Sequence, residues 1–152
     1  MKQKDKKLLL KDLCARLPYR VKVQRYSYEN DIETIETLRE IDSDGYMATL
    51  ECDTLMTISK PYLFPLSSMT EEQKRELLEL TGYESRCEES YGFDSWGFYV
   101  NIVGEYEYEN NQESIILYPD YIGIDWLNKN HFDYRGLIPK GLANDATGKG
   151  IY

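Results

Sequence analysis

Residues 96–109 read Trp-Gly-Phe-Tyr-Val-Asn-Ile-Val-Gly-Glu-Tyr-Glu-Tyr-Glu, the most regular pattern in this chain of 152 residues. Apolar and aromatic residues recur at every second position from Trp96 to Tyr108, with Gly104 among them. Successive side chains of a strand point to opposite faces, so the alternation predicts a half-buried strand, bent or bulged at Gly104. Polar residues 109–112 then predict a turn into an apolar strand over residues 114–118, which gives an antiparallel hairpin.

Further strands are expected before this hairpin. Residues 20–28 alternate valine with polar residues and predict a strand. Residues 32–41 fit neither a helix nor a strand pattern, but the Asp-Ser-Asp-Gly sequence that follows favours a β-hairpin, with another short strand at residues 54–59. Residues 40–51 also resemble a calcium-binding EF-hand loop. They begin with Glu rather than Asp and lead into a strand-like segment, so we favour the ordinary turn.

Three helices are expected. The first should run from about residue 5 to 17, because apolar residues recur there at helical spacing and basic residues take the other positions. The apolar set is Leu9, Leu10, Leu13, Cys14 and Leu17, and the basic set is Lys6, Lys7, Lys11 and Arg16. A third helix should follow Pro119-Asp120, anchored by Trp126 and Leu127.

The second helix is marked by its start. Thr70-Glu71-Glu72-Gln73 is a capping box, which predicts a helix over residues 71–80 with Leu77, Leu78 and Leu80 facing inward. Residues 60–68 before it contain two prolines and predict an extended linker.

These elements indicate an α+β fold, with one antiparallel sheet of about five or six strands and three helices packed on it. With 41% apolar and 13% aromatic residues, the chain can bury a core, so we expect a single domain over residues 1–152. The lysine-rich start (1–5) and the Gly-containing tail (144–152) have the least reason to be ordered. No apolar run has the ~18 residues of a membrane span, so a cytoplasmic protein without membrane contact is expected.

The charge is strongly segregated. Residues 1–28 hold nine Lys or Arg and two Asp, a net charge of +7, whereas residues 29–113 hold five Lys or Arg and twenty-one Asp or Glu, a net charge of −16. An acidic surface repels nucleic-acid phosphates and complements a basic protein. Direct nucleic-acid binding is therefore disfavoured, except through the basic first 28 residues. A merely solvated acidic surface is the plainer interpretation.

Tyrosine is frequent, at 14 of 152 residues, and several tyrosines lie among acids. Such side chains suit a protein-binding surface because tyrosine buries a large area and keeps a polar tip. The alternative, which we favour for Tyr106 and Tyr108, is that they line the core face of their strand. The candidate interaction surface comprises Tyr26, Tyr28, Glu105, Glu107 and Glu109.

Three widely spaced cysteines and one histidine give neither a disulfide framework nor a zinc-ligand spacing. The sequence therefore predicts no metal, no cofactor and no catalytic residue.

One segment nevertheless concentrates chemically versatile residues. His131 could act as an acid or base and Arg135 could anchor an anion. In the competing, structural interpretation, Asn130 or His131 ends the helix, Phe132 and Leu137 fill the core, and Arg135 pairs with an acid of residues 29–113. The candidate binding residues are Trp126, His131, Asp133, Tyr134 and Arg135.

Three blocks of sequence carry a resemblance. They are Trp-Leu-Asn-Lys-Asn-His-Phe-Asp-Tyr-Arg-Gly-Leu-Ile at 126–138 with the Pro-Lys-Gly-Leu-Ala that follows, Lys-Pro-Tyr-Leu-Phe-Pro-Leu-Ser-Ser-Met-Thr-Glu-Glu at 60–72, and residues 8–19. Together they resemble a family of small uncharacterised proteins from phages and mobile elements of gut anaerobic bacteria. The resemblance covers somewhat under half the chain and carries no activity. It implies a bacterial or phage-infected cell and an accessory role in phage–host interplay.

The function expected from these observations is a non-enzymatic interaction module. Its acidic, tyrosine-rich surface would engage a host or phage protein with a basic surface, in an anti-defence or nucleic-acid-mimicking role. The alternative is a small-ligand-binding protein or enzyme that uses residues 131–135. Nothing in the sequence indicates an oligomeric state.

Overall fold

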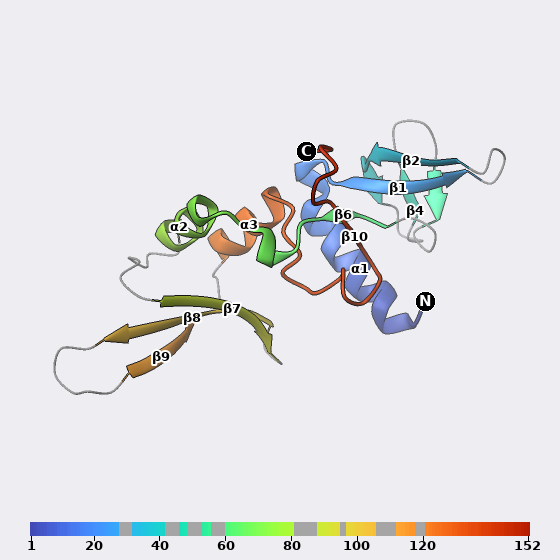
Figure 1. Cartoon of the computed structure of the whole chain (residues 1–152). Coiled ribbons are helices and arrows are strands. Elements are labelled where there is room, and N and C mark those ends of the chain that lie inside the picture. Colours follow the sequence, from blue (N-terminus) through green and yellow to red (C-terminus); the bar gives the residue numbers. More distant parts are fainter. Residues whose placement is uncertain are drawn as a thin grey trace.

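The computed structural model describes residues 1–27, 32–41, 46–48, 53–55, 60–80, 88–94, 97–105, 112–117 and 121–152. Within these ranges the chain is α+β, with three α-helices, two short 3-10 turns and small sheets (Figure 1). None of the described helices is long and apolar enough to cross a membrane.

The three expected helices are present as α1 (Gln3–Arg16), α2 (Glu71–Leu80) and α3 (Tyr121–Lys129). The capping box at the start of α2 is confirmed. The Thr70 amide donates to Gln73 Oε1 at 2.9 Å, and the Gln73 amide donates to Thr70 Oγ1 at 3.2 Å. Leu77 is buried as expected, but Leu80, the last residue of α2, is 42% exposed.

The buried face of α1 differs from the expected one. It consists of Leu9, Asp12, Leu13 and Arg16, whereas Cys14 is exposed. The prediction that placed Arg16 on the solvent side is therefore wrong. The reason is that the guanidinium finds acceptors inside the molecule, so its burial leaves no charge unpaired.

The expected sheet of five or six antiparallel strands is wrong. The described strands form four small sheets. β1 (Lys22–Ser27) pairs with β2 (Ile32–Thr37), and β3 (Glu40–Ile41), β4 (Tyr46–Ala48) and β5 (Asp53–Leu55) form a second antiparallel unit. The third contains β7 (Glu88–Asp94), β8 (Gly97–Glu105) and β9 (Gln112–Leu117), also antiparallel. The prediction was wrong because hairpin signals indicate pairing between strands that follow each other in the sequence, but not pairing between separate hairpins. In the structure β7–β9 lie at the opposite end of the molecule from β1–β5, with α1 between them (Figure 1).

The hairpin predicted from residues 96–118 is confirmed in its pairing. β8 pairs with β9 in antiparallel register, with Val100 opposite Leu117 and Ile102 opposite Ile115. β8 ends at Glu105, and Tyr106 and Tyr108 lie outside the described residues. The face of the strand that they occupy therefore stays a prediction.

Residues 60–68, expected as an extended linker, form a central element instead. β6 (Tyr62–Leu63) pairs in parallel with β10 (Asn144–Asp145), and both residues of β6 are buried. Lys60 accepts from the Gln24 amide on one side at 2.8 Å, and Phe64 exchanges backbone hydrogen bonds with residues 131 and 133 on the other. The prolines flank the strand rather than interrupt it, which is where a strand tolerates them.

The Gly-containing tail from residue 144 packs along this element. β10 belongs to it, Ala146 is 1% exposed, and the Ala146 amide donates to Leu63 O at 2.9 Å. The Tyr152 hydroxyl donates to Tyr62 O at 2.7 Å and accepts from the Lys22 amide at 2.9 Å.

Two apolar clusters meet at this centre. One lies between α1, β1, β6 and the C-terminal segment and includes Leu9, Leu13, Val23, Leu63 and Leu137. The other joins α2 to α3 through Leu77, Trp126, Leu127, Phe132 and Tyr134. The residues singled out as a candidate site therefore lie at the second cluster.

Candidate functional site

The candidate segment begins where α3 ends. The Phe132 amide donates to Leu127 O at 3.0 Å and the His131 amide to Asn128 O at 3.1 Å, the two hydrogen bonds of a Schellman motif. His131 has a φ of 59°, the left-handed conformation that this motif requires of the residue after the helix. The expected helix end at Asn130 or His131 is thus confirmed, with histidine in a position that usually holds glycine.

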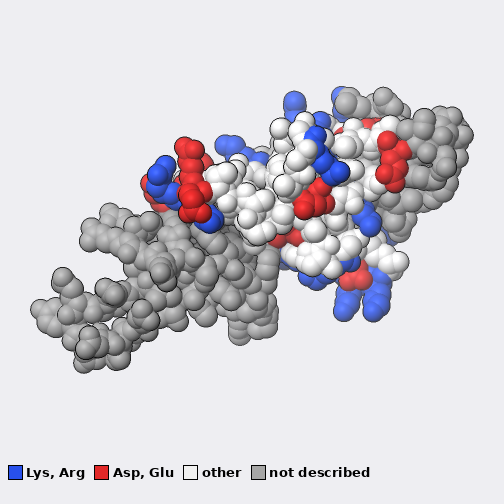
Figure 2. Space-filling model, viewed as in Figure 1, with Lys and Arg blue, Asp and Glu red and all other residues white. Residues whose placement is uncertain are grey.

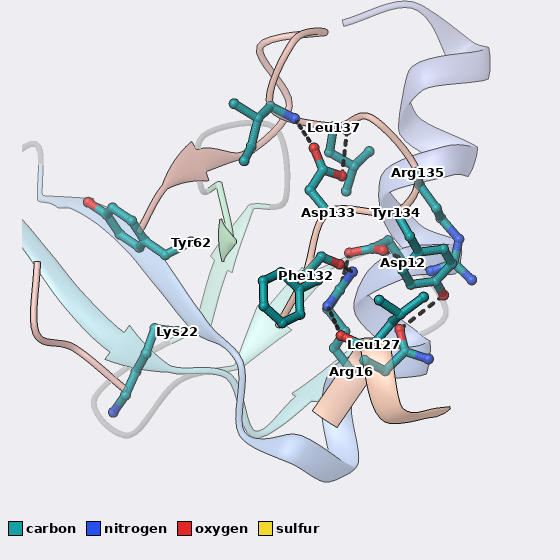
Figure 3. A network of polar contacts seen from close by, with 12 residues as sticks. Asp12, Arg16, Lys22, Tyr62, Leu127, Phe132, Asp133, Tyr134, Arg135 and Leu137 are labelled. Atoms are coloured by element: carbon teal, nitrogen blue, oxygen red, sulfur yellow. Dashed lines mark hydrogen bonds and ion pairs between the residues drawn. The ribbon is translucent and has the colours of Figure 1, made fainter. Parts of the chain in front are cut away.

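A buried polar network links this helix end to α1 (Figure 3). Arg16, 0% exposed, donates through Nε to Asp12 Oδ2 at 2.8 Å and through Nη2 to Phe132 O at 2.6 Å. Its Nη1 lies 3.4 Å from Leu127 O. Both carbonyls also accept a backbone amide, Leu127 O from Phe132 and Phe132 O from Tyr134. Arg16 adds a cationic donor from a different helix at the negative end of the α3 dipole. We call Asp12, Arg16 and Arg135 the α1–α3 clamp.

Arg135 completes the clamp from the loop after α3. Its Nη1 donates to Asp12 Oδ1 at 2.8 Å, so Asp12 uses both carboxylate oxygens on two guanidinium groups. Asp12 belongs to the basic first 28 residues. The expectation that Arg135 would pair with an acid of residues 29–113 is therefore wrong, because the helix packing brings Asp12 nearer.

Tyr134 lies against the clamp. The Arg135 guanidinium stands 4.4 Å and that of Arg16 5.4 Å from the ring centroid, within the range of cation–π attraction. The hydroxyl donates to Asn128 Oδ1 at 3.0 Å. Burial raises the pKa of Tyr134, so the phenol stays protonated and acts as a hydrogen-bond donor.

Asp133 is committed to the backbone. Its two oxygens accept from the amides of Leu137 at 2.8 Å and Ile138 at 2.7 Å and hold the turn that contains Gly136 at a φ of 66°. Leu137 is 0% exposed and Phe132 2% exposed, which confirms that both fill the core.

His131 is buried beside the end of the chain. Its ring stacks on Tyr152 with the centroids 3.9 Å apart, and Nδ1 has no hydrogen-bond partner. Burial, together with the positive charges of Arg16 and Lys22, lowers the pKa of His131 to about 4. The imidazole is therefore neutral at pH 7 and a weak base.

The structure thus brings all five candidate residues together, but as packing rather than around an open cleft. Trp126 stacks on Phe132 at 5.8 Å, and it, His131, Asp133 and Tyr134 are no more than 7% exposed. This arrangement stabilises the junction of α1, α3 and the C-terminal segment. It offers no paired free acid and base, because both oxygens of Asp133 accept backbone amides and the Tyr134 hydroxyl is bonded to Asn128.

Sequence reasoning missed Asp12 and Arg16. The signal was present, since both share the i, i+3, i+4, i+7 spacing of Leu9 and Leu13, which places all four residues on one helix face. A charged pair four residues apart within an apolar face indicates a buried ion pair.

The candidate interaction surface is described only in part. Tyr26 lies in β1 opposite Glu33, and Glu105 ends β8 opposite Gln112. Tyr28, Glu107 and Glu109 lie outside the described residues. In the part of the chain that the structure describes, no group of three or more Cys, His, Asp or Glu residues could hold a metal ion.

Comparison with protein-family models, with curated proteins and with solved structures finds no match to this chain.

The depressed pKa of His131 leads to a pH-dependent stability. The unfolded histidine takes up its proton near pH 6.5, whereas the folded one does so only near pH 4. The free energy of unfolding should therefore fall by about 3 kcal/mol as the pH is lowered from 6.5 to 4, at 1.36 kcal/mol per pH unit. Urea denaturation at several pH values measures this.

The control is His131→Asn, because asparagine tolerates the left-handed conformation and does not titrate. Its pH dependence should lack the histidine contribution. An NMR titration of the His131 ring with a midpoint near 6.5 would contradict the buried environment described above.

Proposed function

We propose that this protein is a non-enzymatic interaction module that engages a partner with a basic surface through its acidic region. The observation that carries this proposal is the net charge of −16 over residues 29–113, part of which α2 exposes to solvent. A concentrated negative surface attracts a basic partner and accelerates its association.

The charges on α2 are incompletely neutralised within the chain. Acidic and basic side chains gather over α2 (Figure 2). Lys74 pairs with Glu71 at 2.5 Å, and Arg75 lies 4.0 Å from Glu79. Glu72 and Glu76, one helical turn apart and exposed, make no ion pair within the described residues. Like charges at this spacing destabilise a helix by about 0.2–0.5 kcal/mol, so a basic partner would relieve a cost that the free protein bears.

The packing of residues 126–135 supports an interaction role over a catalytic one. Their side chains serve the clamp, the helix end and the turn after it, and His131 has a pKa of about 4, too low for a general acid or base at neutral pH. We therefore favour the interaction module over an enzyme or ligand-binding protein that uses these residues.

Tyr26 in β1 and Glu105 in β8 lie at opposite ends of the molecule (Figure 1), so they would contact a partner as separate regions. The proposed surface is formed by the exposed acids of α2, with Tyr26, Tyr28, Glu105, Glu107 and Glu109 as further candidate contacts. Its partner would be a host or phage protein with a basic surface, consistent with the family that the sequence resembles. A partner that normally binds nucleic acid would make this surface a mimic of phosphates.

Salt-dependent capture tests the proposal. Tagged protein is expressed in a gut anaerobic bacterium, and co-purifying proteins are identified by mass spectrometry. Screening shortens from roughly 10 Å at 0.1 M salt to 3 Å at 1 M, so a stoichiometric partner at the lower salt should be lost at the higher. The double variant Glu72→Gln and Glu76→Gln should reduce capture of the partner about fivefold at 0.1 M salt. This is the effect of losing two exposed ion pairs with the partner, at about 0.5 kcal/mol each.

The matched control is Asp5→Asn with Asp125→Asn, which changes the net charge equally outside residues 29–113. It should capture as much partner as the unaltered protein. Capture that ignores salt, or no partner in either condition, counts against the proposal.

A further inference from the structure

A pocket of about 630 Å³ lies where the 3-10 turn after α1, the start of β1, the end of β2 and the last residues of the chain meet. Its walls include Tyr19, Arg20, Lys22, Arg39 and Tyr152. Its volume falls within the range of small-molecule sites, about 300–1,000 Å³. None of the five candidate residues from 126 to 135 lines it.

The charge of this pocket is opposite to that of the protein. Three cationic side chains line it, from Arg20, Lys22 and Arg39, and the described lining residues include no Asp or Glu. Arg20 and Arg39 are exposed and make no ion pair within the described part of the chain. Lys22 is partly buried, and its Nζ donates to the Thr37 hydroxyl at 2.7 Å rather than to a carboxylate. A partly buried cation without a counter-charge is costly, which an anionic ligand would offset.

The backbone at the pocket is unusual as well. Arg20 has a φ of 57°, a left-handed conformation that is uncommon for residues other than glycine. It follows a 3-10 turn, η1 (Leu17–Tyr19), and its amide donates to Leu17 O at 3.3 Å. Arg20 therefore caps η1, and this role fixes the backbone of a residue that lines the pocket.

Aromatic rings form another part of the wall. Tyr152 is fixed by its two hydroxyl hydrogen bonds, to Tyr62 O and from the Lys22 amide, and by stacking on His131. Tyr19 is held by a hydrogen bond from its hydroxyl to Asp125 Oδ1, so this nearby carboxylate already has a donor. Rigid aromatic side chains suit the flat face of a ring at a low cost in conformational entropy.

We propose that this pocket binds a small phosphate ester that carries a planar ring, of the class of nucleoside monophosphates. Arg20 and Arg39 pair with the phosphate, and the ring lies against the tyrosine wall. A phosphate with a charge of about −1.5 to −2 matches three cations better than a single carboxylate does, and guanidinium groups bind it in a bidentate manner. The pocket is independent of the acidic surface, so this proposal stands or falls separately from the proposed function.

Calorimetric titration with AMP, GMP, CMP and UMP, each separately at low salt, tests this assignment. At least one nucleotide should bind with a Kd below about 1 mM. The corresponding nucleoside and inorganic phosphate should each bind at least about tenfold more weakly, because each lacks one of the two recognised groups.

Two variants locate the site. Arg39→Gln and Arg20→Asn should each weaken binding about tenfold, and asparagine keeps the left-handed backbone accessible at residue 20. The control Lys4→Gln removes an exposed cation near the start of α1, about 20 Å along the helix from the pocket, and should bind as the unaltered protein does. Circular dichroism verifies that each variant is folded.

Three results would overturn the proposal. The first is no heat of binding for any of the four nucleotides up to about 10 mM. The second is equal affinity for the nucleotide and for inorganic phosphate or the nucleoside. The third is unchanged affinity in both folded arginine variants.

Discussion

Asp12→Ala should lower the free energy of unfolding by about 3–5 kcal/mol, because it leaves two guanidinium groups without their carboxylate at a buried site. Asp12 is 0% exposed and bonds Arg16 through one oxygen and Arg135 through the other, each at 2.8 Å. Urea denaturation followed by circular dichroism measures the loss. Asp5→Ala, in the first turn of the same helix, should cost less than about 1 kcal/mol, the usual contribution of an acid to the helix dipole.

A double-mutant cycle separates the ion pair from general damage to α1. Arg16→Met should also be strongly destabilising, because it leaves Asp12 and the carbonyls at the end of α3 without this donor. If the clamp acts as a unit, the double variant loses at least about 1 kcal/mol less than the two single variants together. Additive losses would contradict a coupled clamp. Asp12→Asn serves in the cycle if the alanine variant does not fold.

Asp133→Ala should cost about 2–4 kcal/mol, because two backbone amides lose their acceptor at once. These amides belong to Leu137 and Ile138, and the first is part of the core that packs on α1. Asp133→Asn keeps one acceptor oxygen and should cost about half as much. Urea denaturation of both variants measures these losses. Equal stability of the alanine variant and the unaltered protein would show that these hydrogen bonds do not hold the turn.

Elements that depend on neighbouring residues were predicted well. The capping box fixes the start of α2 by two hydrogen bonds three residues apart. The alternation predicts a strand from its own residues alone, and the strand is present as β8 over Gly97–Glu105. The pairing of β8 with β9 could be predicted because only six residues separate the two strands in the sequence. Such signals are present in any local window of the sequence.

The prediction of a single large sheet was wrong, because local patterns do not determine how separate hairpins are arranged. Whether one hairpin continues into another depends on contacts between distant segments. Here Tyr62 and Leu63 pair with residues 144 and 145 instead, in a parallel arrangement that no local pattern indicates. Contacts with a large separation in sequence also determine which polar groups are buried.

The candidate site illustrates the same limit. His131, Asp133 and Arg135 were identified correctly as neighbours, because they are close in sequence. Asp12, which pairs with Arg135, and Arg16, which donates to Phe132 O, lie more than a hundred residues away. The choice between a functional site and core packing for residues 131–135 therefore depended on contacts with α1. These contacts favour a structural role for the segment.

The decisive experiment compares how three forms of the protein bind the captured partner. The unaltered protein, the Glu72→Gln and Glu76→Gln variant, and His131→Asn are titrated with the purified partner at 0.1 M and 1 M salt. We expect the glutamine variant to bind about fivefold more weakly at low salt, His131→Asn to bind normally, and high salt to weaken the binding of all three. Salt-independent binding that His131→Asn abolishes while remaining folded would contradict it, and would place the function in the segment that we assign to the scaffold.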